Sequence, residues 1–153
     1  MITTVPVCAE DASFLFELYC TTRADEISAW GLDLVLAEQL MRMQWQAQTH
    51  SYQLQFPAMD HRIIYSDNTK AGRMIVDETD RELHLVDLSL LPALRNQGIG
   101  TRLLQQLQRE AGQQNKALAL SVYLSNPARR LYERLGFSVV SEDGLYVKMK
   151  WFG

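Results

Sequence analysis

The chain has 153 residues, of which 47% are hydrophobic and 22% charged, and its formal net charge is −3. This length and apolar content suit a single domain over residues 1–153 with one substantial core. The acidic balance argues against nucleic-acid binding, which needs a basic face, and no stretch approaches the roughly 18 apolar residues that indicate a membrane span.

Cysteines and histidines give no sign of a disulfide framework or a metal site. Two cysteines, Cys8 and Cys20, are too few for a disulfide-stapled fold. The three histidines, His50, His61 and His84, form no pair with zinc-ligand spacing. The N-terminus also lacks the basic and apolar segments of a secretory signal. We therefore expect a cytoplasmic protein without a metal cofactor.

The N-terminal third predicts a strand and two helices. The strand is Ile2–Val7. Asp11 is placed to cap the first helix, which carries the apolar stripe Phe14, Leu15, Leu18 and Tyr19. The second helix runs from about Asp33 to Gln48, with Leu36, Leu40 and Met43 at helical spacing.

Three strands separated by short turns follow, and then a loop with two glycines and a helix. The strands are His61–Ser66, Gly72–Asp77 and Glu82–Leu91. The helix starts near Gly98 and has the core stripe Ile99, Leu103, Leu104, Leu107 and Ala111.

The last part predicts a strand, a short helix and two closing strands. Ala117–Val122 is the strand, Asn126-Pro127 opens the helix and Gly136 ends it. The closing strands are Phe137–Ser141 and Leu145–Trp151. The order β-α-α-β-β-β-α-β-α-β-β predicts an α/β fold with a mixed (α+β) sheet that is not doubly wound. Its one strand–helix–strand crossover, from Glu82 to Val122, predicts a parallel pair that splays into a ligand cleft.

The loop Arg95–Thr101 follows a strand and opens a helix, as a pyrophosphate cradle does. Glycines let the backbone approach a ligand closely, and the first amides of a helix attract anions. A dinucleotide fingerprint would need a third glycine where Leu103 stands, and a Walker A loop would need a lysine between Gly100 and Thr101. A tight turn without a ligand remains the alternative for this motif alone.

Two segments together, LLPALRNQGIGTRLL and SNPARRLYERLGF, resemble the GNAT superfamily of acyl-CoA-dependent N-acyltransferases. The first matches the family motif R/Q-x-x-G-x-G/A. The second matches N-x-x-A-x-x-x-Y-x-x-x-G-F with local differences in spacing. The predicted element order also fits that fold over essentially the whole chain. The resemblance implies direct transfer of an acetyl or short acyl group from acetyl-CoA to a primary amine.

The resemblance also implies which residues hold acetyl-CoA. The backbone of Leu88 and Leu90 would pair with the pantetheine arm. The pyrophosphate would lie against Arg95, Asn96, Gln97, Gly98, Gly100 and Thr101. Asn126 would contact pantetheine or only cap its helix, and Arg129 would reach a phosphate or remain on the helix surface.

For catalysis, the resemblance implies that Tyr132 protonates the departing CoA thiolate, with core packing as the alternative. His84 is the candidate base, since a group with a pKa near 6.5 accepts a proton at neutral pH. The alternatives are that His84 is structural, that Asp87 is the base, or that deprotonation occurs through water. No cysteine lies near the predicted site, which argues against an acyl-cysteine intermediate.

The acceptor is the least constrained part. Glu26 is a candidate for recognising an ammonium group, Trp30 for walling the acceptor, and Asp87 for contacting it. The acceptor is a small molecule or a peptide amine, the latter a protein N-terminus or lysine, and the chain is a monomer or a homodimer. A catalytically silent acyl-CoA-binding regulatory module on the same fold is the main rival.

Overall fold

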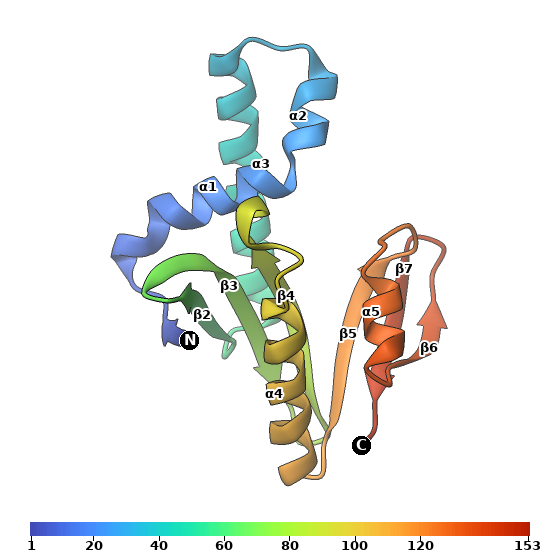
Figure 1. Ribbon diagram of the computed structural model, residues 1–153. Coiled ribbons are helices and arrows are strands. Elements are labelled where there is room, and N and C mark those ends of the chain that lie inside the picture. The colour runs from blue at the N-terminus through green and yellow to red at the C-terminus, as the bar shows by residue number, and fades with distance from the viewer. The chain divides into compact units, whose positions relative to one another are not determined.

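The computed structural model describes all residues, 1–153, in two compact units. One unit comprises residues 1–73 and 89–94, and the other comprises residues 74–88 and 95–153. The helices are α1 (Ala12–Thr22), α2 (Ala24–Trp30), α3 (Leu34–Gln55), α4 (Ile99–Gln113) and α5 (Arg129–Arg134) (Figure 1). The strands are β1 (Ile2–Pro6), β2 (Asp60–Ser66), β3 (Thr69–Glu78), β4 (Glu82–Leu90), β5 (Ala117–Tyr123), β6 (Ser138–Glu142) and β7 (Tyr146–Trp151).

The strands form one mixed sheet in the order β1-β2-β3-β4-β5-β7-β6. β1 pairs antiparallel with β2, and β7 pairs antiparallel with both β5 and β6. β4 and β5 are parallel, as the intervening helix α4 requires. The predicted mixed α/β sheet with one parallel pair is therefore confirmed.

The first unit differs from the predicted helices at three points. Asp11 does not cap α1, because its carboxylate accepts hydrogen bonds from the Cys8 amide at 2.9 Å and from Lys70 Nζ at 2.7 Å. These bonds lower the pKa of Asp11 from 3.8 to about 2. The short helix α2 was not predicted. α3 begins as predicted after Asp33, whose side chain accepts from the Leu36 amide, but continues to Gln55.

The buried face of α3 is not the leucine stripe that its spacing suggests. Ala37 and Met41 are the buried residues of this helix, whereas Leu36, Leu40 and Met43 are exposed. Towards α1, the Trp45 ring packs on Phe16 with ring centroids 5.3 Å apart. α3 therefore has two apolar faces, of which only one is packed within its unit.

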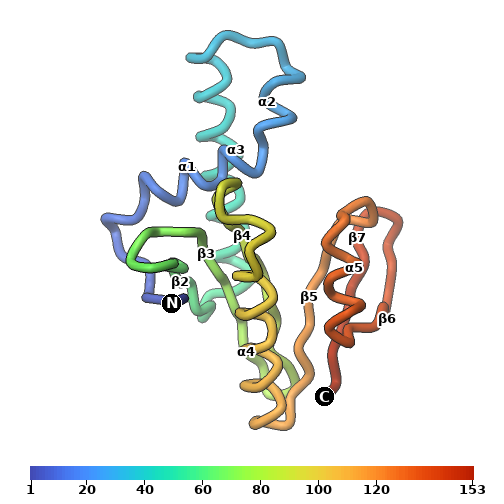
Figure 2. The backbone as a smooth tube through the Cα atoms, viewed as in Figure 1, coloured from blue at the N-terminus to red at the C-terminus, as the bar shows by residue number.

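In the second unit, α4 packs on β5 (Figure 2). All five residues of the predicted core stripe are at most 4% exposed: Ile99, Leu103, Leu104, Leu107 and Ala111. The α4 prediction is confirmed in both its start and its buried face. Burial of these side chains fixes the position of the α4 N-terminus, where the glycine loop ends.

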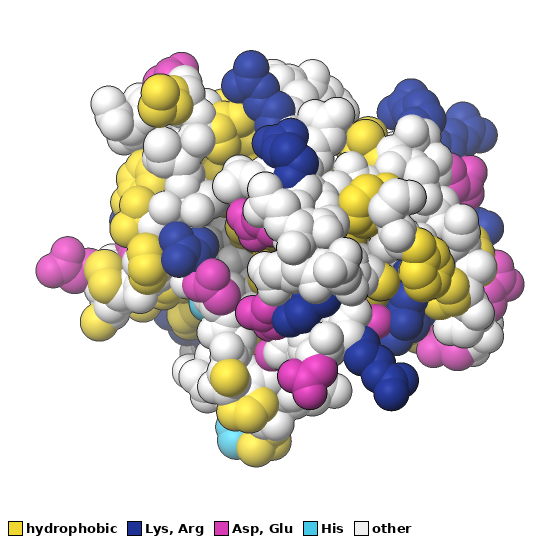
Figure 3. Space-filling view, turned by 90° about the horizontal axis from the view of Figure 1, so that it is seen from below, with side chains coloured by type: hydrophobic (Ala, Val, Ile, Leu, Met, Phe, Trp, Pro, Cys, Tyr) yellow, Lys and Arg dark blue, Asp and Glu magenta, His cyan; other side chains and the backbone are white.

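The surface carries charges of both signs. Figure 3 shows Lys and Arg side chains interspersed with Asp and Glu side chains on one face, with no stripe of one sign. Among the helices, none combines the length and apolar character that crossing a bilayer requires.

Candidate functional site

The glycine loop presents the uncapped N-terminus of α4. Gly98 occupies the N-cap position with φ of +83°, a conformation that favours glycine, and Asn96 is also left-handed, with φ of +61°. No side chain caps the helix, and no acidic residue lies in its first turn. The first amides of α4 therefore lack a capping side chain, which leaves them suited to an anionic ligand.

Gly100 lies in the first turn of α4, and its surroundings do not require a glycine. A Cβ built at Gly100 meets no atom within 4 Å, and its φ is not positive. Glycine in a helix costs up to about 1 kcal/mol relative to alanine. Packing within the protein does not explain the glycine at this position, whereas close approach of a ligand to the backbone would.

The parallel register of β4 and β5 ends early. It joins Glu82–Leu85 to Ala117–Leu120, although β4 continues to Leu90 and β5 to Tyr123. Val86–Leu88 and Ser121–Tyr123 therefore lie beyond the paired segments. Leu88, whose backbone is predicted to pair with the pantetheine arm, lies on this stretch. Leu90, the second residue of that prediction, belongs to the other unit.

A short turn and a tight cap hold α5 at its two ends. Asn126 Oδ1 accepts a hydrogen bond from the Ala128 amide at 2.9 Å, which forms an Asx turn before the helix. The predicted helix start at Asn126-Pro127 is two residues early, because α5 begins at Arg129 and its N-cap residue, Ala128, makes no side-chain cap. Gly136, with φ of +94°, ends the helix. The Phe137 amide donates to the Tyr132 carbonyl and the Gly136 amide to the Glu133 carbonyl, both at 3.0 Å. This is a Schellman motif.

The cap fixes the surroundings of Tyr132. The buried Phe137 ring meets the Tyr132 ring edge-to-face, with centroids 5.9 Å apart. Burial, and secondarily the negative charge of Asp87, raises the pKa of the Tyr132 phenol above 10. Asp87 and Tyr132 therefore share one electrostatic environment, and the phenol stays protonated at neutral pH.

Two residues that the sequence analysis missed hold the cap of α5 in place. Gln108 of α4 donates from Nε2 to the Leu135 carbonyl at 2.8 Å. Trp151 of β7 lies against Gly136, where an added Cβ would be 3.3 Å from Trp151 Cδ1. No sequence motif connects these residues to Tyr132, because the contacts come from three different elements.

His84 lies on the other face of β4 from Asp87 by the alternation of the strand. Leu83 and Leu85, 4% and 5% exposed, share the parity of Asp87, and His84 has the opposite parity. Burial lowers the pKa of His84 below 6.5, and the positive charge of Lys148 adds to this, whereas the charges of Glu82 and Asp77 oppose it. The imidazole is therefore neutral at pH 7.

Arg129 and Glu26 have partners within the protein. Arg129 Nε donates to Glu133 Oε1 at 3.1 Å, and its Nη2 lies 4.0 Å from Glu142 Oε1. Glu26 pairs with Arg23 at 3.2 Å. Glu26 and Trp30 belong to α2 in the first unit, whereas Arg129 belongs to the second.

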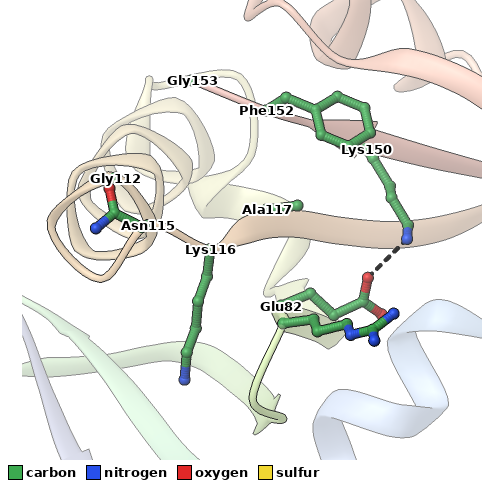
Figure 4. A pocket seen from close by; sticks show the side chains of 9 residues that line it. Glu82, Gly112, Asn115, Lys116, Ala117, Lys150, Phe152 and Gly153 are labelled. Carbon is green, nitrogen blue, oxygen red and sulfur yellow. Dashed lines mark ion pairs between the residues drawn. The ribbon is translucent and has the colours of Figure 1, made fainter.

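A separate cavity of about 600 Å³ lies at the opposite end of α4 from the glycine loop (Figure 4). Its lining includes Gly112, Lys116 and Lys150, and none of the predicted site residues. Its two lysines are already paired, Lys150 with Glu82 at 2.8 Å and Lys116 with Glu78 at 2.6 Å. We therefore assign the candidate site to the glycine loop and α5.

The comparisons with known proteins concern the family and the fold. Residues 57–139, more than half of the chain, match the family model of the acetyltransferase (GNAT) domain. None of the curated proteins matches the sequence.

Similar solved structures cover nearly the whole chain. One is the PaiA N-acetyltransferase from Thermoplasma acidophilum in complex with coenzyme A, with a TM-score of 0.72, 18% identity and coverage of 100% of this chain and 99% of that chain. Another is the ribosomal-protein-S18-alanine N-acetyltransferase from Escherichia coli, with a TM-score of 0.68, 19% identity and coverage of 99% and 93%. An acetyltransferase from Thermus thermophilus has a TM-score of 0.68, 19% identity and coverage of 98% and 96%. At these identities the likeness concerns the fold.

Substitution of Gly136 by alanine is expected to destabilise the protein more than the same change at Gly144. Both glycines have positive φ, +94° and +87°, but a Cβ at Gly144 meets no atom within 4 Å. Both variants should lose about 1 kcal/mol of unfolding free energy through the backbone conformation, and Gly136→Ala should lose more through Trp151. Urea denaturation measures the difference, and equal losses would show that Trp151 does not restrain the cap.

Proposed function

Because the chain belongs to the GNAT acetyltransferase family and is an acyltransferase, we propose that it transfers an acetyl group from acetyl-CoA directly to a primary amine. The observation that carries this proposal is the glycine loop. There the N-terminus of α4 has no capping side chain, and a Cβ added at Gly100 would meet no atom within 4 Å. Acetyl-CoA supplies the activated acetyl thioester, and its pyrophosphate is the anion that these amides would bind.

The donor set at the loop fits a pyrophosphate. The amides of Gly98, Gly100 and Thr101 belong to the loop and the first helical turn, and the Thr101 hydroxyl adds a donor. Arg95 supplies positive charge, with Asn96 and Gln97 as further polar groups in the loop. Beyond the paired segment of β4, the backbone of Leu88 would bind the pantetheine arm, and Leu90 would extend this contact.

Tyr132 would act on the leaving thiolate as a hydrogen-bond donor. Its raised pKa keeps the phenol protonated at neutral pH. Even at ordinary pKa values of about 10 for a phenol and 8.5 for a thiol, complete proton transfer is uphill by about 2 kcal/mol. Tyr132 would therefore stabilise the developing thiolate through a hydrogen bond. It would give up its own proton only if the attacking amine supplied another proton to the phenol.

His84 would take the proton from the acceptor ammonium group. A neutral imidazole at pH 7 can accept this proton, directly or through water. His84 lies opposite Ala119 within the paired part of the β4–β5 ladder, one residue before its end, so water would carry the proton to it. Water and Asp87 are the competing bases.

The acceptor would be a small-molecule or peptide amine recognised by residues of the first unit, with Glu26 and Trp30 as candidates. A catalytically silent acyl-CoA sensor is the rival function, for which the same loop would bind acetyl-CoA without turnover. Asn126 and Arg129 are the remaining cofactor candidates, although Asn126 already accepts from the Ala128 amide and Arg129 already pairs with Glu133.

Alanine at position 100 is expected to separate folding from cofactor binding. With acetyl-CoA at about a hundredfold excess over Kd, the wild-type melting temperature should rise by about 5–10 °C, with a similar rise for CoA and none for NAD. Gly100→Ala should stabilise the free protein by up to about 1 kcal/mol and lose most of this ligand shift. Gly112→Ala is the matched control at the other end of α4 and should keep the shift. No shift with either CoA species would remove the cofactor assignment.

The phenol of Tyr132 is expected to matter for turnover and not for binding. Tyr132→Phe should lower kcat by about a hundredfold or more, measured as thiol release with an amine acceptor, while the thermal shift by acetyl-CoA is kept. Tyr65→Phe serves as the control. Unchanged kcat in Tyr132→Phe would refute its role, and absence of turnover in the wild type with a broad amine panel would favour the sensor.

Activity is expected to rise with pH through the lowered pKa of His84, because only the neutral imidazole accepts the proton. In the wild type, kcat/KM should therefore fall only when the pH is below 6.5, the ordinary pKa of a histidine. At pH 7, kcat/KM should not depend on the ionisation of His84. His84→Gln should lower kcat/KM at pH 7 and lose this acid limb. An acid limb that persists unchanged in His84→Gln would assign the base to another group.

A further inference from the structure

The outward face of α3 carries five apolar residues and one histidine at coiled-coil spacing. We call its six residues the α3 seam: Leu36, Leu40, Met43, Ala47, His50 and Leu54. Successive members are separated by four, three, four, three and four residues, the spacing of a and d positions in a heptad. The seam thus follows the 22-residue helix for about 27 Å, from 18 residues at 1.5 Å each.

The large side chains of the α3 seam are exposed to an extent that is unusual for one helix. The exposed fractions are 47% for Leu36, 37% for Leu40, 65% for Met43 and 70% for Leu54. Ala47 and His50 are exposed as well. The packed side of the helix, with Ala37 and Met41, lies about 100–140° away around the helix axis. An unbroken exposed stripe of this kind marks an interaction surface.

The borders of the α3 seam carry no charge, which favours a second copy of the same chain. The flanking positions hold Gln39, Gln46 and Gln53 on one side and Gln44 and Ser51 on the other. The two charged residues of α3, Glu38 and Arg42, lie off the seam and pair with each other at 3.1 Å. Two copies can therefore bring these faces together without opposing like charges, although each chain has a net charge of −3.

We propose that the α3 seam is the interface of a homodimer in which two α3 helices pack antiparallel about a two-fold axis. In this arrangement Leu36 faces the partner's Leu54, Leu40 faces the partner's His50, and Met43 faces the partner's Ala47. Each large or long side chain thus meets a complementary one, and each contact occurs twice, as two-fold symmetry requires. A parallel pair would instead set Ala47 against the partner's Ala47, leaving a gap, and His50 against the partner's His50.

The size of the α3 seam sets the strength of the dimer. A strip of about 27 Å by the 10–12 Å width of a helix covers on the order of 300 Å² in projection. Stable interfaces bury about 800 Å² per partner. The seam is smaller than this, so the dimer is weak and reversible.

Sedimentation velocity over a micromolar concentration series tests the interface. The wild type should shift from monomer to dimer with concentration, and Met43→Glu should weaken the dimer by at least about tenfold, since two buried charges would lack partners. Val35→Glu is the matched control, because Val35 is 67% exposed on the same helix, about 100° from the seam centre. Circular dichroism checks that both variants are folded.

Cysteine crosslinking tests the orientation. A mixture of Leu36→Cys and Leu54→Cys proteins should give a disulfide between positions 36 and 54 of different chains, identified by mass spectrometry of the linked peptides. A link between two copies of position 36 in Leu36→Cys alone would overturn the antiparallel arrangement. A wild type that stays monomeric throughout, or a dimer that Met43→Glu leaves intact, would overturn the interface and assign the seam to another partner.

Discussion

The early end of the parallel register between β4 and β5 is the constraint on which the candidate site depends. Pairing stops at Leu85 and Leu120, so the chain beyond these residues is free of the parallel ladder on that side. Asp87 lies on this stretch of β4, and β5 leads from Tyr123 into the turn at Asn126 that begins α5. The negative charge of Asp87, on the stretch of β4 beyond the ladder, contributes to the raised pKa of Tyr132 in α5. A ladder continued to the ends of both strands would satisfy the same backbone groups internally and leave no edge for a ligand.

The two helices beside this edge use their ends in opposite ways. The N-terminus of α4 is left without a capping side chain, which costs stability in the free protein and is offset only when an anion binds. The C-terminus of α5 is closed by a Schellman motif and held from outside by Gln108 and Trp151. The backbone donors of α4 that we assign to a ligand are thus left open, whereas α5, which carries the proposed catalytic residue Tyr132, is closed at its C-terminal end.

Sequence patterns predicted those parts of the fold that depend on short-range periodicity or on single backbone conformations. The α4 stripe and the glycine end of α5 belong to this class, because five apolar positions at one period, or one left-handed residue, leave few alternatives. The contacts of Gln108 and Trp151 with the end of α5 could not be predicted from the sequence, since they join segments that only the folded sheet brings together. The electrostatic contact of Asp87 with Tyr132 was likewise not predicted, because Asp87 alone gives no indication of its partner.

α3 shows why apolar spacing alone does not identify a buried face. Leu36, Leu40 and Met43 mark the more hydrophobic stripe, yet the unit buries the side that carries Ala37 and Met41. The small Ala37 and the long, flexible Met41 allow close packing, and Trp45 supplies the large surface towards Phe16. A leucine stripe is equally suited to packing within a chain or between chains, so its periodicity specifies an interface without specifying the partner.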